Sequence, residues 1–143
     1  MFDNKNFLVL IETTSEGEAK KVGLELMNPA RKMADQVGEE VIALVMGDKT
    51  DKAVEDVKRY GADRIVVVQG ESYKDYDTEV YTNAFIKVIE KYEPNVVLIG
   101  ATALGRDLGP RIAGQVFIQR KRLTLKKILK LYMKHLTFLN TRS

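Results

Sequence analysis

The sequence contains no cysteine, which excludes disulfide bridges, zinc–thiolate and iron–sulfur sites and a cysteine nucleophile. Its single histidine, His135, has no second histidine or cysteine with which to hold a metal ion and no triad to join. No apolar run approaches the roughly 18 residues that a membrane-spanning helix needs. The first residues also lack the basic region, apolar core and cleavage site of a secretory signal. We therefore expect a cytoplasmic protein with no catalytic residue, no metal site and no transmembrane segment.

Nucleotide-binding fingerprints are missing from the place where an α/β fold would most often carry them. The loop after the first apolar run, residues 12–18, contains neither G-x-G-x-x-G nor G-K-[ST]. Its acidic and hydroxyl residues, Glu12 to Ser15, could offer oxygen atoms to a ligand, but such residues are common in strand-to-helix loops. The loop by itself therefore does not identify a ligand.

Acidic residues are absent from one part of the chain. Residues 1–113 carry 15 Lys and Arg against 20 Asp and Glu, whereas residues 114–143 carry 8 Lys and Arg and no acid. The overall net charge of +3 hides this difference. An acidic body followed by a basic tail indicates two segments of different origin or role.

Apolar runs alternate with helical patterns along the acidic part. The runs that predict strands are 7–11, 41–46, 65–68 and 96–99. The helical patterns are 26–37, 50–60 and 81–92, with a fourth helix after Thr102, which is placed to cap it. Pro29 lies inside the first helical pattern and predicts a kink or a late start there. The inward faces are expected to include Val37 and Tyr60.

This alternation predicts an α/β fold, an open parallel sheet of strand order 3-2-1-4 with helices on both faces and right-handed crossovers, as in Rossmann-like proteins. The first and fourth strands then lie on either side of a switch point, where ligands and partners of such sheets usually bind. The segments that follow them, Glu12–Ser15 and Gly100–Gly105, are expected to flank one crevice.

The segment ATALGRDLGPRIA, preceded by VVLIG, resembles the N-terminal domain of the electron-transfer flavoprotein α subunit. Its most specific part is Gly100 to Arg111, and the similarity extends back to cover roughly residues 5–114. The resemblance implies an adenine-nucleotide hydrolase-like fold that generally binds no nucleotide itself. It also implies pairing with a β subunit, and electron transfer through FAD from flavin dehydrogenases to an acceptor. In the family, FAD sits mainly on a C-terminal domain that has no counterpart in this sequence.

The similarity stops at Gly114, and we divide the chain there into a family domain, residues 1–114, and a basic amphipathic tail, residues 115–143. A shifted reading frame in a truncated gene would explain both the change in composition and the loss of similarity. The tail has apolar residues at helical spacing, which is compatible with a cover for a sheet edge or with a helix on an anionic membrane or partner.

The candidate site residues lie at the start of the fourth helix. Arg106, Asp107 and Arg111 are predicted to form a subunit or domain interface, with a purely structural role as the alternative. Thr102, Gly105 and Arg106 are the weaker candidates for contact with a cofactor, because anions bind at helix N-termini. Gly105 can instead permit close packing of helix on sheet.

We therefore predict the docking domain of an electron carrier rather than an enzyme that converts a substrate. The alternative is a small nucleotide-binding module similar to universal stress proteins. The spacing of Gly100, Gly105, Gly109 and Gly114 does not match the phosphate-binding pattern of that group.

Overall fold

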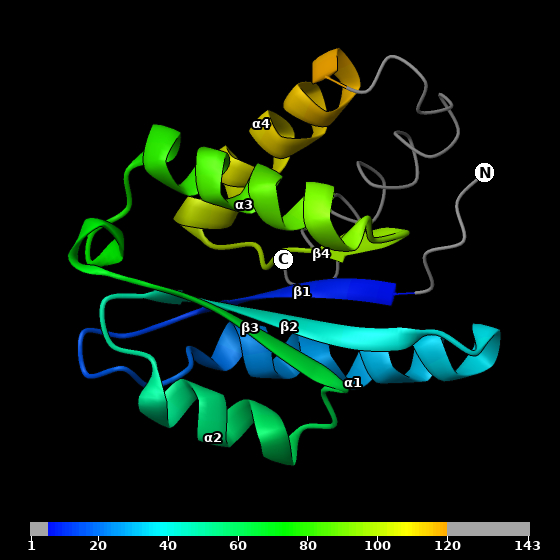
Figure 1. Ribbon diagram of the computed structural model, residues 1–143. Helices are drawn as coiled ribbons and strands as arrows, with labels where there is room; N and C mark the ends of the chain where they lie inside the picture. Colours follow the sequence, from blue (N-terminus) through cyan, green and yellow to red (C-terminus); the bar gives the residue numbers. More distant parts are fainter. Residues whose placement is uncertain (1–5, 120–143) are drawn as a thin grey trace.

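Four parallel strands form one sheet in the order β3-β2-β1-β4, as predicted (Figure 1). The computed structural model describes residues 6–119. The strands are β1 (Asn6–Glu12), β2 (Glu40–Gly47), β3 (Arg64–Gln69) and β4 (Val96–Leu98). The helices are α1 (Lys21–Val37), α2 (Asp51–Arg59), α3 (Thr78–Tyr92) and α4 (Ala103–Gln119), with a short 3-10 turn, η1 (Glu71–Tyr73), before α3. In β1, Phe7 pairs with Val41 of β2 and with Val96 of β4, which fixes β1 at the centre.

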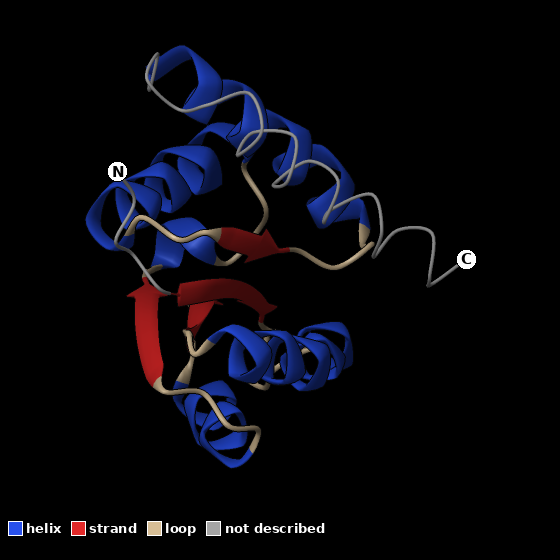
Figure 2. Cartoon of the chain, turned by 90° about the vertical axis from the view of Figure 1, so that its right-hand side faces the viewer, coloured by secondary structure: helices blue, strands red, loops and turns tan. Residues whose placement is uncertain are grey.

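Helices cover both faces of the sheet, which confirms the expected layers (Figure 2). On one face, Leu8 and Leu10 of β1 pack in a cluster with residues of α3 and α4. On the other face, Phe7, Val9 and Ile11 pack in a second cluster with residues of α1 and α2. Because successive side chains of a strand point to opposite faces, both sets must be apolar, and the central strands read as continuous apolar runs.

Local sequence signals set the end of α1 and the start of α3. Gly38 ends α1 in the left-handed conformation, with φ 68°, which glycine adopts without steric cost. The Asp77 side chain caps α3 by accepting a hydrogen bond from the Val80 N–H at 3.0 Å. This cap places the start of α3 at Thr78, three residues before the apolar pattern begins at Tyr81.

Three details of the predicted helices were wrong. Helix α1 does not start late, because it begins at Lys21 and runs through Pro29 to Val37. Val37 was expected on the inward face, but it is the last residue of α1 and is 60% exposed. Tyr60 is 46% exposed, because α2 ends at Arg59 and the chain turns away at the following residues.

Helix α4 continues through Gly114, the residue at which the composition changes, and is described as far as Gln119. The division of the chain at this residue stays a prediction. The expected helical tail falls on residues 120–143 and, like His135, lies outside the described residues. Among the residues that are described, no helix is long and apolar enough to cross a membrane.

Candidate functional site

The carboxyl ends of β1 and β4 meet at the predicted switch point through a hydrogen bond between Glu12 and Thr102. The Thr102 hydroxyl donates to Oε2 of Glu12 at 2.8 Å, across 90 positions of the chain. The same hydroxyl accepts a hydrogen bond from the Gly105 N–H at 3.0 Å, so Thr102 caps α4 as its position predicts. The two predicted loop segments therefore flank one crevice.

Glycine at positions 100 and 105 allows α4 to start directly against the end of the sheet. A Cβ atom on Gly105 would lie 1.9 Å from the carbonyl oxygen of Gly100. A Cβ atom on Gly100 would lie 2.5 Å from Cγ2 of Val22, in α1. These glycines therefore serve close packing of helix on sheet. A contact of Thr102, Gly105 or Arg106 with a cofactor stays a prediction.

A cavity of about 370 Å³ lies at this crevice, beside the N-terminus of α4. Its lining combines one buried carboxylate, two ammonium groups and two phenol rings with the first turn of α4. The lining residues are Glu12, Thr13, Lys20, Lys74, Tyr76, Tyr81, Thr102, Ala103 and Leu104. Glu12 is 5% exposed, whereas Lys20 and Lys74 reach the surface.

Asp107 joins α4 to the segment that leads into α3. Its Oδ2 atom accepts hydrogen bonds from the Tyr76 hydroxyl at 2.6 Å and from the Thr78 hydroxyl at 2.8 Å. Nε of Arg111, one turn later, lies 3.6 Å from Oδ1. The hydrogen bonds from Tyr76 and Thr78, followed by the charge of Arg111, lower the pKa of Asp107.

The phenol of Tyr76 responds in the opposite direction. Burial, together with the hydrogen bond to the Asp107 carboxylate, raises the pKa of Tyr76 to about 12. Burial also raises the pKa of Tyr81 to about 12, and the charge of Glu12 adds to that effect. Both phenols therefore stay protonated at neutral pH and keep donating, Tyr76 to Asp107 and Tyr81 to the carbonyl oxygen of Tyr73 at 2.7 Å.

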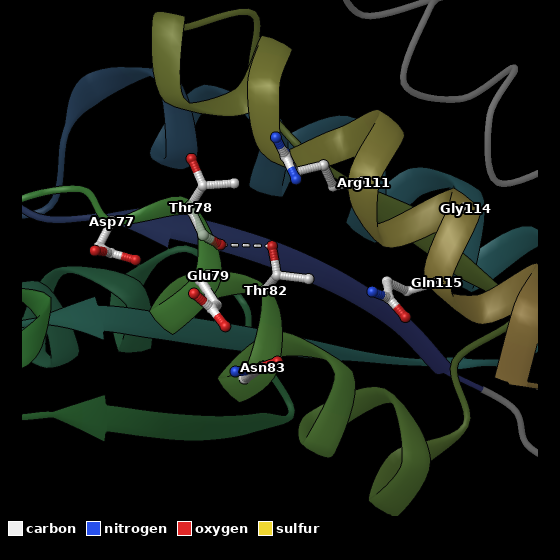
Figure 3. Close-up of a pocket in the computed structure, with 8 residues that line it drawn as sticks. All are labelled: Asp77, Thr78, Glu79, Thr82, Asn83, Arg111, Gly114 and Gln115. Carbon is white, nitrogen blue, oxygen red and sulfur yellow. Dashed lines mark hydrogen bonds between the residues drawn. The ribbon is translucent and has the colours of Figure 1, made fainter.

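A second hollow, of about 730 Å³, lies between the start of α3 and the middle of α4 (Figure 3). Arg111, Gly114 and Gln115 border it from α4. Thr78, Glu79, Thr82 and Asn83 border it from α3. The Thr82 hydroxyl donates to the carbonyl oxygen of Thr78 at 2.6 Å, so it is bound within its own helix. The lining is polar and carries charges of both signs, which suits contact with another polar surface.

The structure distributes the three predicted interface residues differently. Arg111 is 60% exposed and borders the second hollow, while Asp107 is occupied by hydrogen bonds within the domain. Arg106 is exposed, and its guanidinium forms no hydrogen bond or ion pair with the rest of residues 6–119. Arg106 and Arg111 are thus exposed, whereas Asp107 fixes the helix that carries them.

Four residues that line the crevice were not predicted from the sequence, because no sequence pattern marks them as site residues. Lys20, Lys74, Tyr76 and Tyr81 line the cavity, but Tyr81 reads as an ordinary core position of a helix and the other three as loop or helix-start residues. Within the described part of the chain, no group of three or more acidic, histidine or cysteine side chains is arranged to hold a metal ion.

Comparison with known proteins gives a consistent family. The family model described as "Electron transfer flavoprotein domain" matches residues 7–119. The electron transfer flavoprotein subunit alpha of Clostridium acetobutylicum is 36% identical over 101 residues, which cover 71% of this chain and 30% of that protein. The acryloyl-CoA reductase electron transfer subunit beta of Anaerotignum propionicum is 35% identical over 101 residues, which cover 71% of this chain and 28% of that protein.

The chain spans about a third or less of the length of these curated relatives. A third relative, the lactate dehydrogenase (NAD(+),ferredoxin) subunit LctC of Acetobacterium woodii, is 36% identical over 100 residues, covering 70% of this chain and 24% of that protein. Among solved structures, N,N'-diacetylchitobiose deacetylase from Pyrococcus horikoshii superposes with a TM-score of 0.53 at 18% identity, over 89% of this chain and 55% of that one. This last similarity concerns the α/β fold alone.

Proposed function

The chain belongs to the electron transfer flavoprotein family, and we propose that it is the N-terminal domain of an alpha subunit that docks a beta subunit. In the complete heterodimer, this domain holds the partner in place while FAD, bound elsewhere, carries electrons from flavin dehydrogenases to an acceptor. The proposal includes a cytoplasmic location and the division into a family domain, residues 1–114, and a basic tail, residues 115–143.

The observation that carries the docking role is the pair of exposed guanidinium groups on α4. Arg106 has no partner within residues 6–119, and Arg111 keeps only a long contact of 3.6 Å with Asp107. Arginine is enriched at protein interfaces, where its planar group binds carboxylates in two places at once. Two such groups on one helix favour a partner surface that carries carboxylates.

The helix that presents these groups is held rigidly. Asp107 ties α4 to Tyr76 and Thr78, and Gly105 sets its first turn against the end of β4. Side chains that are fixed before binding lose less conformational entropy when a complex forms. A docking platform needs this property, because it must orient an electron carrier without moving itself.

The described residues do not fit FAD itself. The cavity at the switch point measures about 370 Å³, at the small end of ligand pockets. Gly100 and Gly105, beside it, pack against protein atoms and leave no space for a ligand at their Cα atoms. The hollow beside Arg111 carries the carboxylates of Asp77 and Glu79 and no aromatic side chain. FAD, when bound to the complete protein, supplies the redox chemistry, and this domain contributes docking and orientation only.

The test is association with the beta subunit encoded in the same genome. We expect Arg106→Glu combined with Arg111→Glu to weaken binding at least tenfold, because the reversed charges face the same partner carboxylates. Binding is measured by titration calorimetry with the whole chain.

Lys32→Glu is the matched control, because Lys32 is exposed on α1, on the opposite face of the sheet. Circular dichroism verifies that every variant is folded. Equal losses for the control and the double variant, or a wild-type chain that does not bind the beta subunit, would contradict the proposal.

A further inference from the structure

Glu12 is a buried carboxylate with one oxygen atom left over. Its residue is 5% exposed, and Oε2 accepts the hydrogen bond from Thr102. Oε1 is buried as well and accepts no hydrogen bond from the described residues. The Lys20 ammonium lies 3.8 Å from Oε1, beyond hydrogen-bond distance. Buried polar atoms without a partner are rare in native proteins, and each one calls for an explanation.

The hydroxyl groups around the cavity cannot supply the missing donor. The Tyr76 hydroxyl donates a hydrogen bond to Asp107, and the Tyr81 hydroxyl donates one to the carbonyl oxygen of Tyr73. Thr102 already donates to the other oxygen of Glu12, and Thr13 donates to the carbonyl oxygen of Met46 at 2.9 Å. A hydroxyl group has one proton, so none of these side chains has a second one for Oε1.

The charges on the cavity wall favour a negative ligand. The side chains of the lining that are charged at neutral pH are Glu12, Lys20 and Lys74, which place two ammonium groups against one carboxylate. Ala103 and Leu104, in the first turn of α4, also line the cavity, and their N–H groups have no acceptor within the helix. A helix N-terminus attracts anions, and the two lysines act in the same direction.

We propose that this cavity binds a small hydroxylated anion, an organic phosphate or carboxylate that also carries a hydroxyl group. The hydroxyl group donates to Oε1 of Glu12, and the anionic group lies against the N-terminus of α4, Lys20 and Lys74. The cavity, of about 370 Å³, lies at the switch point of the parallel sheet, where such folds commonly bind ligands. The proposal goes beyond the docking role and does not depend on it.

The first test compares ligands on the isolated chain by titration calorimetry and by amide NMR shifts. Glycerol phosphate and glycerate each carry a hydroxyl group and a charge, and they distinguish a phosphate from a carboxylate as the anionic group. Methyl phosphate and propionate lack the hydroxyl group, and glycerol lacks the charge. We expect glycerol phosphate or glycerate to bind at least tenfold more tightly than its counterpart without a hydroxyl group, with shifts at the Gly105 amide.

Two substitutions test the two ends of the ligand separately, Glu12→Gln the hydroxyl group and Lys74→Gln the anionic group. Glu12→Gln should remove the tenfold advantage of the hydroxylated ligand, because the one amide oxygen of Gln is taken by the Thr102 hydroxyl. Binding of methyl phosphate should not weaken, because the substitution removes a negative charge from the cavity wall. Lys74→Gln, at an exposed position, should weaken every anion severalfold, and it keeps the test decisive if the buried substitution does not fold. Lys32→Gln on α1 is the control for loss of a lysine charge elsewhere.

Three outcomes would overturn the proposal. They are equal affinities with and without the hydroxyl group, an effect of Lys32→Gln as large as that of Lys74→Gln, and no saturable binding of any anion. In the last case Oε1 is served by solvent alone. None of these results bears on association with the beta subunit, so the two proposals fail separately.

Discussion

Asp107 shows how one side chain can join two helical elements of its own domain. The residue types around it, arginine before and one turn after, made it a candidate for partner contact. Its carboxylate instead accepts two hydrogen bonds from hydroxyl groups of its own domain, Tyr76 and Thr78. Hydrogen bonds to a charged group are stronger than those between neutral groups, so this junction fixes α4 against the start of α3.

Replacing Tyr76 by Phe tests this junction. We expect Tyr76→Phe to raise the pKa of Asp107 toward the ordinary range, because the hydrogen bond from Tyr76 is the largest cause of its lowering. The measurement is a pH titration of the Asp107 carboxyl carbon by NMR.

Tyr60→Phe is the matched control, since it removes the same hydroxyl group from an exposed side chain on α2's end. A pKa of Asp107 that stays equally low in Tyr76→Phe would show that Thr78 and Arg111 suffice, and would remove Tyr76 from the junction.

Single residues of the site were predictable where their role is local. Thr102 caps α4 as expected, because a capping hydroxyl bonds an N–H only three positions later. Its second hydrogen bond, to Glu12, joins residues 90 positions apart. The sequence predicted only that the segments containing these two residues flank one crevice. The partner of Asp107, Tyr76, lies 31 positions away and has no sequence signal.

At the scale of the element, α4 depends on how closely its first turn approaches β4. A side chain at position 105 has no room, since its Cβ atom would lie 1.9 Å from the carbonyl oxygen of Gly100. Gly114 lies in the same helix but has nothing within 4 Å of the corresponding position. The two glycines therefore have opposite expected responses to the same substitution.

Gly105→Ala should lower the free energy of unfolding by about 1 to 3 kcal/mol, because the helix must move away from the sheet to admit a methyl group. Gly114→Ala should raise it by about 0.5 to 1 kcal/mol, because alanine loses less backbone entropy in a helix. Urea unfolding of both variants measures the two effects. A Gly105→Ala protein as stable as Gly114→Ala would contradict the close packing.

The strands and helices were predictable because helices cover both faces of the sheet. Buried strands therefore appear as continuous apolar runs, and the helices carry apolar residues at helical spacing. All four strands were found within two residues of their ends, and α3 was found from its apolar pattern. The late start predicted at Pro29 was wrong, because α1 begins at Lys21 and includes this proline. The kink predicted as the other possibility stays a prediction. Tyr60 was misjudged because apolar spacing does not reveal where a short helix ends.

At low pH, the stability of the whole molecule depends on carboxylates that are charged and hydrogen-bonded in the folded state. Partial burial alone would raise the pKa of Asp63, but hydrogen bonds from Arg31 and from the Val41 N–H outweigh it and lower the pKa. Arg31 also donates to Asp35 and to the carbonyl oxygen of Gly61, so it connects α1 with the turn before β3. Stability from Asp63 and Asp107 is present above the unfolded pKa of aspartate and is lost as the pH falls through the lower folded values.

On the alkaline side, the phenols of Tyr76 and Tyr81 make the stability of the fold depend on pH. Burial raises the pKa of both Tyr76 and Tyr81 to about 12, above the ordinary value of about 10. Their contribution to stability is therefore complete below pH of about 10 and is lost as the pH rises through about 12, because the unfolded chain ionises first. Tyr81 is the stronger case, since it is 5% exposed and packs edge-on against Tyr73 and Tyr76.

We expect Tyr81→Phe to reduce the loss of unfolding free energy across this alkaline window by roughly 2 kcal/mol, because the variant has no buried phenol to ionise at that position. Its stability at neutral pH should be lower, since the hydrogen bond to the carbonyl oxygen of Tyr73 is gone. Urea unfolding at a series of pH values gives both quantities, with Tyr60→Phe as the exposed control. If Tyr81→Phe and Tyr60→Phe both lose stability with rising pH as steeply as the unmodified chain, another group drives alkaline unfolding. The phenols around the switch-point cavity then do not set the upper pH limit of the folded domain.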